Sequence, residues 1–252
     1  MKTFAFSAAL ALSACAPMAY QAPQPLAVAD YAAVLAAADR PAAEEARDAA
    51  RMPAEVLAFA EIAPGETVGD FIMGSGYFTR ILSAAVGPQG KVYAFQPNEF
   101  VTFRADYAKE QDETVAALAN TDGVRGPVAE PPFFGQLDTI ITIQNFHDLY
   151  LDPFEDDTAS RAVASLYSAL KPGGTLVVID HSAAAGSGTS AVDSLHRIDK
   201  RTVVDEVTAG GFVLDGESDL FARPDDPRTA NVFDDGIRGQ TDQFMLRFRK
   251  PV

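Results

Sequence analysis

The stretch from Val68 to Leu82, VGDFIMGSGYFTRIL, constrains the fold more than any other part of the chain. An apolar run, a glycine-containing turn and an amphipathic segment follow one another, as in a buried strand, a tight turn and the start of a helix. Glycine in such a turn lets the backbone approach a ligand closely. The stretch therefore predicts the first strand and helix of a nucleotide-binding α/β domain.

Strand-like and helix-like segments then alternate to the end of the chain. We expect strands at 67–73, 91–96, 124–128, 137–143, 175–179, 212–220 and 242–249, with helices at 41–51, 53–59, 77–86, 99–119, 158–170 and 200–209. Alternation of this kind predicts a Rossmann-like, doubly wound α/β fold. Its sheet has seven strands, is mostly parallel with an antiparallel edge strand, and carries helices on both faces.

The length of 252 residues suits one domain with a substantial core. We expect this domain to span residues 30–252, with N-terminal helices at 30–62 and the sheet core at 63–252. The formal net charge of −15 repels the phosphates of nucleic acids, and no basic run interrupts it. The sequence therefore predicts no nucleic-acid partner.

The first residues have the pattern of a signal peptide, which we place at 1–14. Lys2 precedes an apolar stretch that is too short to span a bilayer. The following Leu-Ser-Ala-Cys sequence resembles a bacterial lipobox, which implies lipidation of Cys15, the chain's only cysteine. Ordinary cleavage at the A-x-A-like site around Cys15 is the alternative.

Residues 15–29 are rich in alanine, proline and glutamine, and we interpret them as a tether. Ala16, rather than an aspartate, follows the cysteine. By resemblance to the usual sorting rule, this implies an outer-membrane lipoprotein on the periplasmic side of a bacterial cell envelope. The lipid at Cys15 is then the membrane anchor.

The order of elements and several motifs resemble the class I S-adenosylmethionine-dependent methyltransferases over roughly residues 53–250. The sequence is most similar to a group of predicted bacterial methyltransferases, through the segments GSGYFTRIL, QNFHDLY, IDHSA and LHRID. LKPGGTL is also common in this superfamily before the fifth strand. The resemblance implies S-adenosylmethionine as cofactor and methyl transfer to an unidentified small-molecule substrate.

The resemblance also implies which residues bind the cofactor: Asp70, Gly74, Gly76, Tyr77, Gln96 and Asn145. Two positions depart from the family pattern. Ile72 replaces the first glycine of the turn, and a β-branched residue disfavours positive φ. We therefore expect the turn to take another path, or the strand to end at Ile72. Gln96 replaces an acidic residue, so it can accept a ribose hydrogen bond but carries no charge.

Polar residues follow the predicted fourth and fifth strands, where ligands of open α/β sheets bind. All three histidines of the chain, His147, His181 and His196, lie in or near these positions. We predict His147 and His181 as catalytic residues with Asp148, because histidine titrates near neutrality. Structural hydrogen bonding is the first alternative. A metal site that adds Asp148 or Asp180 to the histidines is the second, but without tight spacing such as H-x-x-x-H we expect no metal.

A second function class is compatible with the same fold. S-adenosylmethionine is a charged molecule made in the cytosol, so its supply outside the inner membrane is not assured. The departures at Ile72 and Gln96 point the same way, and fold alone does not establish function. The alternative is a non-catalytic, small-molecule-binding envelope lipoprotein on a methyltransferase fold.

The lipoprotein interpretation makes a direct prediction. Because acylation requires the thiol, Cys15→Ser should abolish incorporation of labelled palmitate. Cleavage of the signal peptide should also no longer be inhibited by globomycin. Labelling of cells that express the two forms measures this. A wild-type chain that incorporates no palmitate would contradict the prediction and favour ordinary signal-peptide cleavage at the A-x-A-like site.

Overall fold

The computed structural model describes residues 24–252. The predicted signal peptide, Cys15 and the tether up to residue 23 lie outside the described residues. Within the described part, no helix is both long and apolar enough to cross a membrane.

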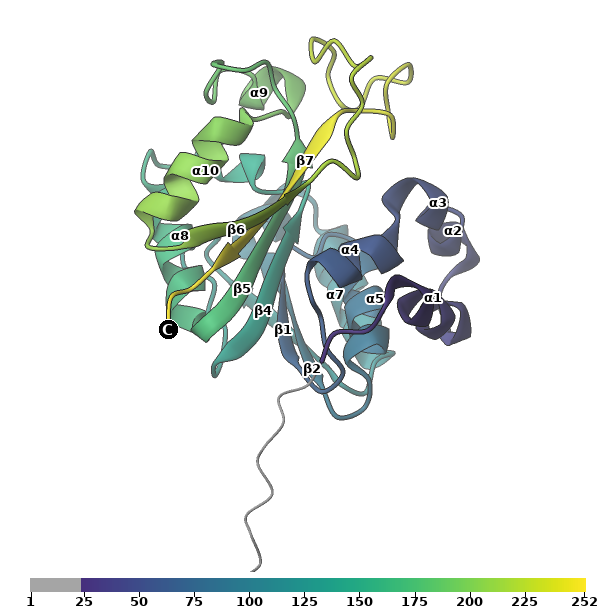
Figure 1. The fold of residues 1–252 in the computed structure, drawn as a ribbon. Helices are drawn as coiled ribbons and strands as arrows, with labels where there is room; N and C mark the ends of the chain where they lie inside the picture. The colour runs from purple at the N-terminus through teal and green to yellow at the C-terminus, as the bar shows by residue number, and fades with distance from the viewer. Residues whose placement is uncertain (1–23) are drawn as a thin grey trace, which may run out of the picture.

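In this part of the chain the sheet has seven strands, in the order β3-β2-β1-β4-β5-β7-β6 (Figure 1). The strands are β1 (Thr67–Phe71), β2 (Lys91–Pro97), β3 (Thr121–Gly126), β4 (Leu137–Ile143), β5 (Leu170–His181), β6 (Val213–Ser218) and β7 (Gln243–Arg249). The first five pair in parallel, and β7 runs antiparallel to both β5 and β6. The predicted fold class, including the antiparallel edge, is confirmed.

Helices cover both faces of this sheet. They are α1 (Val28–Ala37), α2 (Ala42–Glu45), α3 (Asp48–Arg51), α4 (Pro53–Phe59), α5 (Tyr77–Val86), α6 (Asn98–Phe103), α7 (Asp106–Ala116), α8 (Thr158–Ala169), α9 (Val192–Leu195) and α10 (Lys200–Ala209), with a 3-10 turn η1 (His147–Tyr150). One core cluster joins α1, α4 and α5 to the sheet, and a second joins α8 and α10 to the opposite face. Successive side chains of a strand point to opposite faces of the sheet, so each buried strand contributes side chains to both core clusters.

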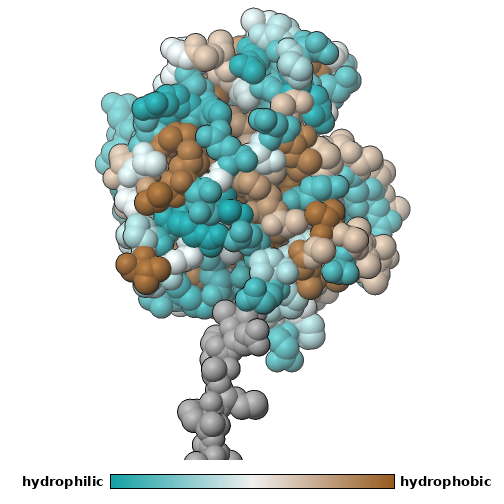
Figure 2. All heavy atoms as spheres, viewed as in Figure 1, coloured by the Kyte–Doolittle hydropathy of each residue, from teal (hydrophilic) through white to brown (hydrophobic). Residues whose placement is uncertain are grey.

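The surface agrees with this arrangement. Figure 2 shows separate brown patches set among teal residues on the face seen in Figure 1. The alanine-rich N-terminal helices give the paler brown surface on the right. A cleft of about 600 Å³ lies among α1 to α4, lined by residues such as Leu35, Arg40 and Met52.

Several element boundaries differ from the sequence prediction, and three of the differences have a physical cause in the structure. The segment 41–51 forms two short helices, because Asp48 pairs with Arg40 and Glu44 pairs with Arg80, and these tertiary bonds set its path. The segment 99–119 breaks at Arg104, which is extended at φ −139°. The third strand covers Thr121–Gly126 instead of 124–128. Its first half contains an aspartate and a glycine, which are depleted in strands, so the sequence pattern does not indicate where the strand begins.

Asp70, the next-to-last residue of β1, is a buried carboxylate that contacts α5. Within residues 24–252 its carboxylate accepts one side-chain hydrogen bond, from Oγ1 of Thr79 to Oδ2 at 2.6 Å. Burial raises the pKa of Asp70 to about 6, and the bond from Thr79 offsets only part of that rise. Asp70 thus ties the first strand to the first crossover helix at an electrostatic cost.

This cost predicts a specific pH dependence. Between about pH 4 and pH 6 the folded state holds a proton on Asp70 that the unfolded state has released, so this group's contribution to stability falls as pH rises. Asp70→Asn removes that loss. Its free energy of unfolding relative to wild type should rise by roughly 2–3 kcal/mol between pH 4 and pH 7.

Urea unfolding at several pH values measures this, with the exposed loop residue Asp235→Asn as control. A difference between Asp70→Asn and wild type that stays constant with pH would contradict the prediction.

Candidate functional site

The turn between β1 and α5 follows the path that a glycine-rich turn takes, despite its isoleucine. Ile72 adopts φ 65°, followed by Gly74 at 56° and Gly76 at 87°. The expectation that Ile72 avoids positive φ is therefore wrong. A left-handed isoleucine costs on the order of 1–3 kcal/mol, and such outliers persist where the surroundings impose them.

Burial in the core and two hydrogen bonds hold Ile72 in this conformation. Its side chain is buried in the core beside Phe71 and Phe95. Its carbonyl oxygen accepts a hydrogen bond of 2.9 Å from Nδ2 of Asn145, and the next amide, of Met73, donates to the carbonyl of Phe95 at 2.9 Å. The turn is thus attached both to the end of β2 and to the segment after β4.

The two glycines of the turn have different surroundings. A Cβ added to Gly74 would meet nothing within 4 Å, whereas a Cβ on Gly76 would lie 2.7 Å from Oγ1 of Thr114. Gly76 is therefore required for packing against α7. Gly74 borders open space, so the backbone there is accessible to a ligand.

Gln96 lies at the carboxyl end of β2 and is fully buried. Neither its Oε1 nor its Nε2 has a hydrogen-bond partner within residues 24–252. Leaving a buried polar group unpaired costs about 1–3 kcal/mol, so native proteins rarely do it without a reason. The neighbouring residue Phe95 pairs with Phe71 of β1, which places Gln96 next to the turn.

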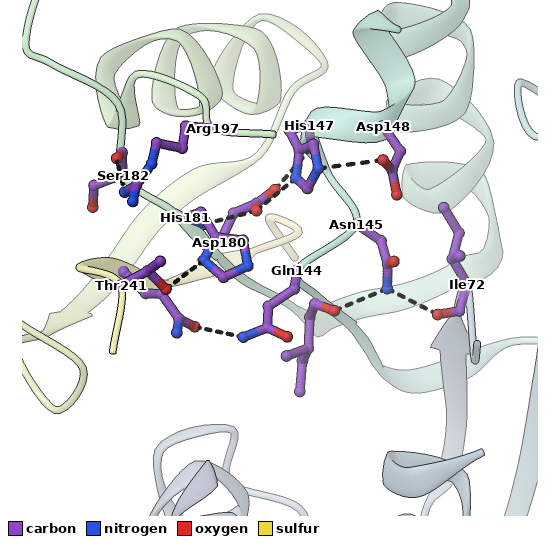
Figure 3. Close-up of polar contacts among 12 residues, drawn as sticks. Ile72, Gln144, Asn145, His147, Asp148, Asp180, His181, Ser182, Arg197 and Thr241 are labelled. Atoms are coloured by element: carbon purple, nitrogen blue, oxygen red, sulfur yellow. Dashed lines mark hydrogen bonds and ion pairs between the residues drawn. The ribbon is translucent and has the colours of Figure 1, made fainter. Parts of the chain in front are cut away.

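Asn145 links the turn to the fourth strand. Its Nδ2 donates to the carbonyls of both Ile72, at 2.9 Å, and Ile143, at 2.8 Å (Figure 3). Gln144, just before it, has φ 63° and bonds to Arg51 of α3 at 2.6 Å. Asn145 is accordingly a positioning residue for the turn.

The other two predicted cofactor residues sit differently. Asp70 is buried one layer below the turn, against α5. Tyr77, the first residue of α5, donates its hydroxyl to Asp48 of α3 at 2.6 Å and lies under the guanidinium groups of Arg47 and Arg51. These contacts fix the N-terminal helices over the start of α5.

A second polar group lies beyond β4 and β5, centred on Asp180 (Figure 3). This fully buried carboxylate accepts three hydrogen bonds. They come from Nδ1 of His147 at 2.8 Å, from the backbone amide of His147 at 2.7 Å and from the backbone amide of His181 at 2.7 Å. Burial raises the pKa of Asp180, but the partners, led by His147, outweigh it and hold the pKa below its usual value. Asp180 thereby fixes both histidines at the carboxyl ends of the strands.

The predicted catalytic residues are brought together around this carboxylate. Nε2 of His147 lies 3.3 Å from Oδ1 of Asp148. Burial lowers the pKa of His147, but Asp180 and Asp148 together raise it above its ordinary value. His181 donates to or accepts from Oγ1 of Thr241 through Nδ1 at 2.8 Å, and burial lowers its pKa to about 4, so its imidazole is neutral near pH 7.

His196 joins the group from a distant part of the sequence. It follows α9 in the left-handed conformation, with φ 52°, and its ring centre lies 5.5 Å from that of His147. The next residue, Arg197, is fully buried and pairs with Asp226 at 2.8 Å. The loop before β7 is thereby attached at the edge of the site.

Sequence reasoning missed several of these contacts. The sequence patterns give Asp180 only as an alternative metal ligand, although an aspartate at the end of a buried strand is a signal for a polar anchor. The Arg51–Gln144 bond and the Arg197–Asp226 pair join segments with no pattern in common, so no local signal reveals them.

Comparison with known proteins supports the fold. No family model matches the chain, and no curated protein matches its sequence. Among solved structures, a SAM-dependent methyltransferase from Aquifex aeolicus has 18% identity and a TM-score of 0.56, covering 88% of this chain and 98% of its own. The glycopeptide N-methyltransferase MtfA, complexed with S-adenosylmethionine, has 15% identity and a TM-score of 0.54, covering 79% and 87%.

The [4+2]-cyclase SpnF is similar to the same degree, with 18% identity, a TM-score of 0.57 and 81% of each chain covered. These similarities show that the chain has the methyltransferase-type fold, as the resemblance in sequence implied. A cyclase among the similar structures means that the reaction must be argued from the site.

The attachment of the turn by Asn145 makes a prediction. Asn145→Ala removes two hydrogen bonds and should lower the free energy of unfolding by about 2 kcal/mol. Asn145→Asp has the same shape but places a carboxylate against two carbonyl oxygens, so it should cost more. Hydrogen exchange of the Met73 amide should also accelerate in both variants.

Asn120 offers a matched control, because its Nδ2 likewise bonds two carbonyls, those of Ser83 and Gly87, away from the turn. Asn120→Ala should lower the free energy of unfolding, but the Met73 amide should exchange no faster than this loss of global stability requires. An unchanged Met73 exchange rate in Asn145→Ala would contradict the proposed attachment.

Proposed function

We propose that this chain is an S-adenosylmethionine-dependent methyltransferase that acts on a small-molecule acceptor. The observation that carries the proposal is Gln96 at the carboxyl end of β2, whose amide is buried and has no hydrogen-bond partner among residues 24–252. In folds of this type the end of the second strand is where a nucleoside ribose is bound. An amide offers both a donor and an acceptor, which suits two hydroxyl groups.

The remaining residues of the turn fit the same ligand. Gly74 leaves open space beside the backbone, and α5 begins directly after the turn, with its free amides at the N-terminus. Asn145 holds the turn against the end of β4. Asp70 holds the start of α5 against β1 through Thr79, and Tyr77 joins it to the N-terminal helices through Asp48. When bound, S-adenosylmethionine supplies an electrophilic methyl group on a sulfonium.

The chain's own contribution is to orient the acceptor. We assign this role to the residues around Asp180, because they lie at the same strand edge as the turn. His181 is held by Thr241 and is neutral, and in the tautomer whose Nδ1 donates to Thr241 its second ring nitrogen can accept a proton from an acceptor group. His147 and Asp148 present a second polar pair. Holding the acceptor in line with the methyl group supplies most of the rate.

Two parts of the proposal rest on sequence alone. Lipidation of Cys15 would place the enzyme at the periplasmic side of the outer membrane, and the negative net charge argues against nucleic acid as the acceptor. The non-catalytic binding lipoprotein is the alternative, and it shares the ligand site but not the reaction.

The proposal predicts opposite effects of one substitution on stability and binding. Gln96→Leu removes two unpaired polar atoms at nearly constant volume, so it should raise the free energy of unfolding by about 1–3 kcal/mol. The same change should weaken binding of S-adenosylmethionine and S-adenosylhomocysteine by tenfold or more. Calorimetric titration and urea unfolding of the full-length chain measure the two quantities.

Gln96→Glu is the matched control, because a carboxylate can accept both ribose hydroxyl groups and should preserve binding. Gly74→Val should abolish binding by filling the open space. No binding to the wild type at millimolar ligand would overturn the methyltransferase proposal. Binding without methyl transfer to any acceptor would favour the non-catalytic alternative.

A further inference from the structure

We propose that His147, Asp148 and His196 form a binding site for a divalent transition-metal ion such as Zn²⁺. One ligand atom from each residue can be chosen so that all three lie within 4.8 Å of one another. The first two come from η1, which follows β4, and the third follows α9, after β5. This inference departs from the sequence-based prediction of no metal, and it does not depend on the methyltransferase proposal.

The spacing of the first two ligands suits a metal. Nε2 of His147 and Oδ1 of Asp148 are 3.3 Å apart. Two ligands at the usual Zn²⁺ distance of about 2.0–2.1 Å, at a tetrahedral angle, lie about 3.3 Å from each other. The pair therefore spans one edge of a coordination tetrahedron without moving.

The outer contacts of His147 are those of a metal ligand. Its Nδ1 is bonded to the buried carboxylate of Asp180 at 2.8 Å, and its backbone amide bonds to the other oxygen of that carboxylate. A carboxylate behind a ligating histidine fixes the ring orientation and leaves the opposite nitrogen to the metal. Here that opposite nitrogen is Nε2, which faces Asp148 (Figure 3).

His196 supplies an independent observation. Its Nδ1 is buried and has no hydrogen-bond partner in the described part of the chain. The residue also keeps a left-handed backbone, with φ 52°, which is costly for histidine and holds its ring against that of His147. The Phe233 ring makes an edge contact with the His196 ring, with the two ring centres 4.9 Å apart, and the adjacent Arg197 forms an ion pair with Asp226.

The donor set indicates the kind of ion. Two imidazoles and one carboxylate suit Zn²⁺, Co²⁺, Ni²⁺ or Fe²⁺, whereas Ca²⁺ and Mg²⁺ prefer oxygen ligands alone. Three protein ligands leave at least one coordination position for a substrate or water, as in catalytic rather than structural zinc sites. Ligands that are far apart in sequence explain why no spacing motif revealed the site.

The test uses the full-length chain, freed of metal with a chelator and titrated with Zn²⁺ and with Co²⁺, whose visible absorption reports nitrogen and oxygen ligation. We expect one ion per chain. His147→Ala and His196→Asn should each weaken binding at least tenfold, and asparagine tolerates the left-handed conformation at 196. Asp180→Asn should weaken binding by about 10–100-fold through the ring of His147.

His181→Ala is the matched control, since its ring centre lies 6.2 Å from that of His147 and its Nδ1 is bonded to Thr241. Circular dichroism checks that each variant is folded. Retained binding in His181→Ala together with loss in His196→Asn supports the site. Binding that survives His196→Asn, that is lost equally in His181→Ala, or that is absent from the wild type with excess Zn²⁺, would overturn it.

Discussion

The bond from the Asn145 amide to the Ile72 carbonyl is the contact on which the site depends. It holds an isoleucine in a backbone conformation that the residue disfavours, and in doing so gives the turn the path of a glycine-rich one. The open space at Gly74 and the position of the start of α5 both follow from that path. Without this bond, only core packing and the bond from the Met73 amide to Phe95 would oppose relaxation of the strain at Ile72.

The segment after β4 joins the two halves of the site. Asn145 reaches the turn on one side, and His147, two residues later, reaches Asp180 at the end of β5. A parallel sheet makes this possible because the carboxyl ends of adjacent strands meet at one edge. One proposed cofactor residue, Asn145, and two of the proposed metal ligands, His147 and Asp148, therefore lie in the same five-residue segment, QNFHD.

The sequence predicted the fold well because the fold depends on local patterns. The β-branched run at 137–143, the turn before α5 and the short link between the last two strands each carry their own signal. The predicted placement of His147 and His181 at strand ends followed from the same patterns, and both histidines contact Asp180 or its neighbours.

The misses have a common physical cause. The backbone preference against positive φ at Ile72 is worth about 1–3 kcal/mol, and the packing and hydrogen bonds that hold the residue outweigh it, so propensity alone gave the wrong path. The contact between the His196 and His147 rings depends on the path of the chain between β5 and α10, and no local sequence pattern indicates that path. The unpaired amide of Gln96 is likewise visible only once burial is known.

The central claim is that the edge formed by the turn and the end of β2 binds a nucleoside cofactor. Photo-crosslinking of radiolabelled S-adenosylmethionine to the full-length chain, followed by peptide mapping, tests it most directly. The account predicts that the label is found in the peptides that contain residues 72–77 or 96–99, and that excess S-adenosylhomocysteine prevents the labelling. Labelling confined to other peptides, or none that the competitor prevents, would contradict the account.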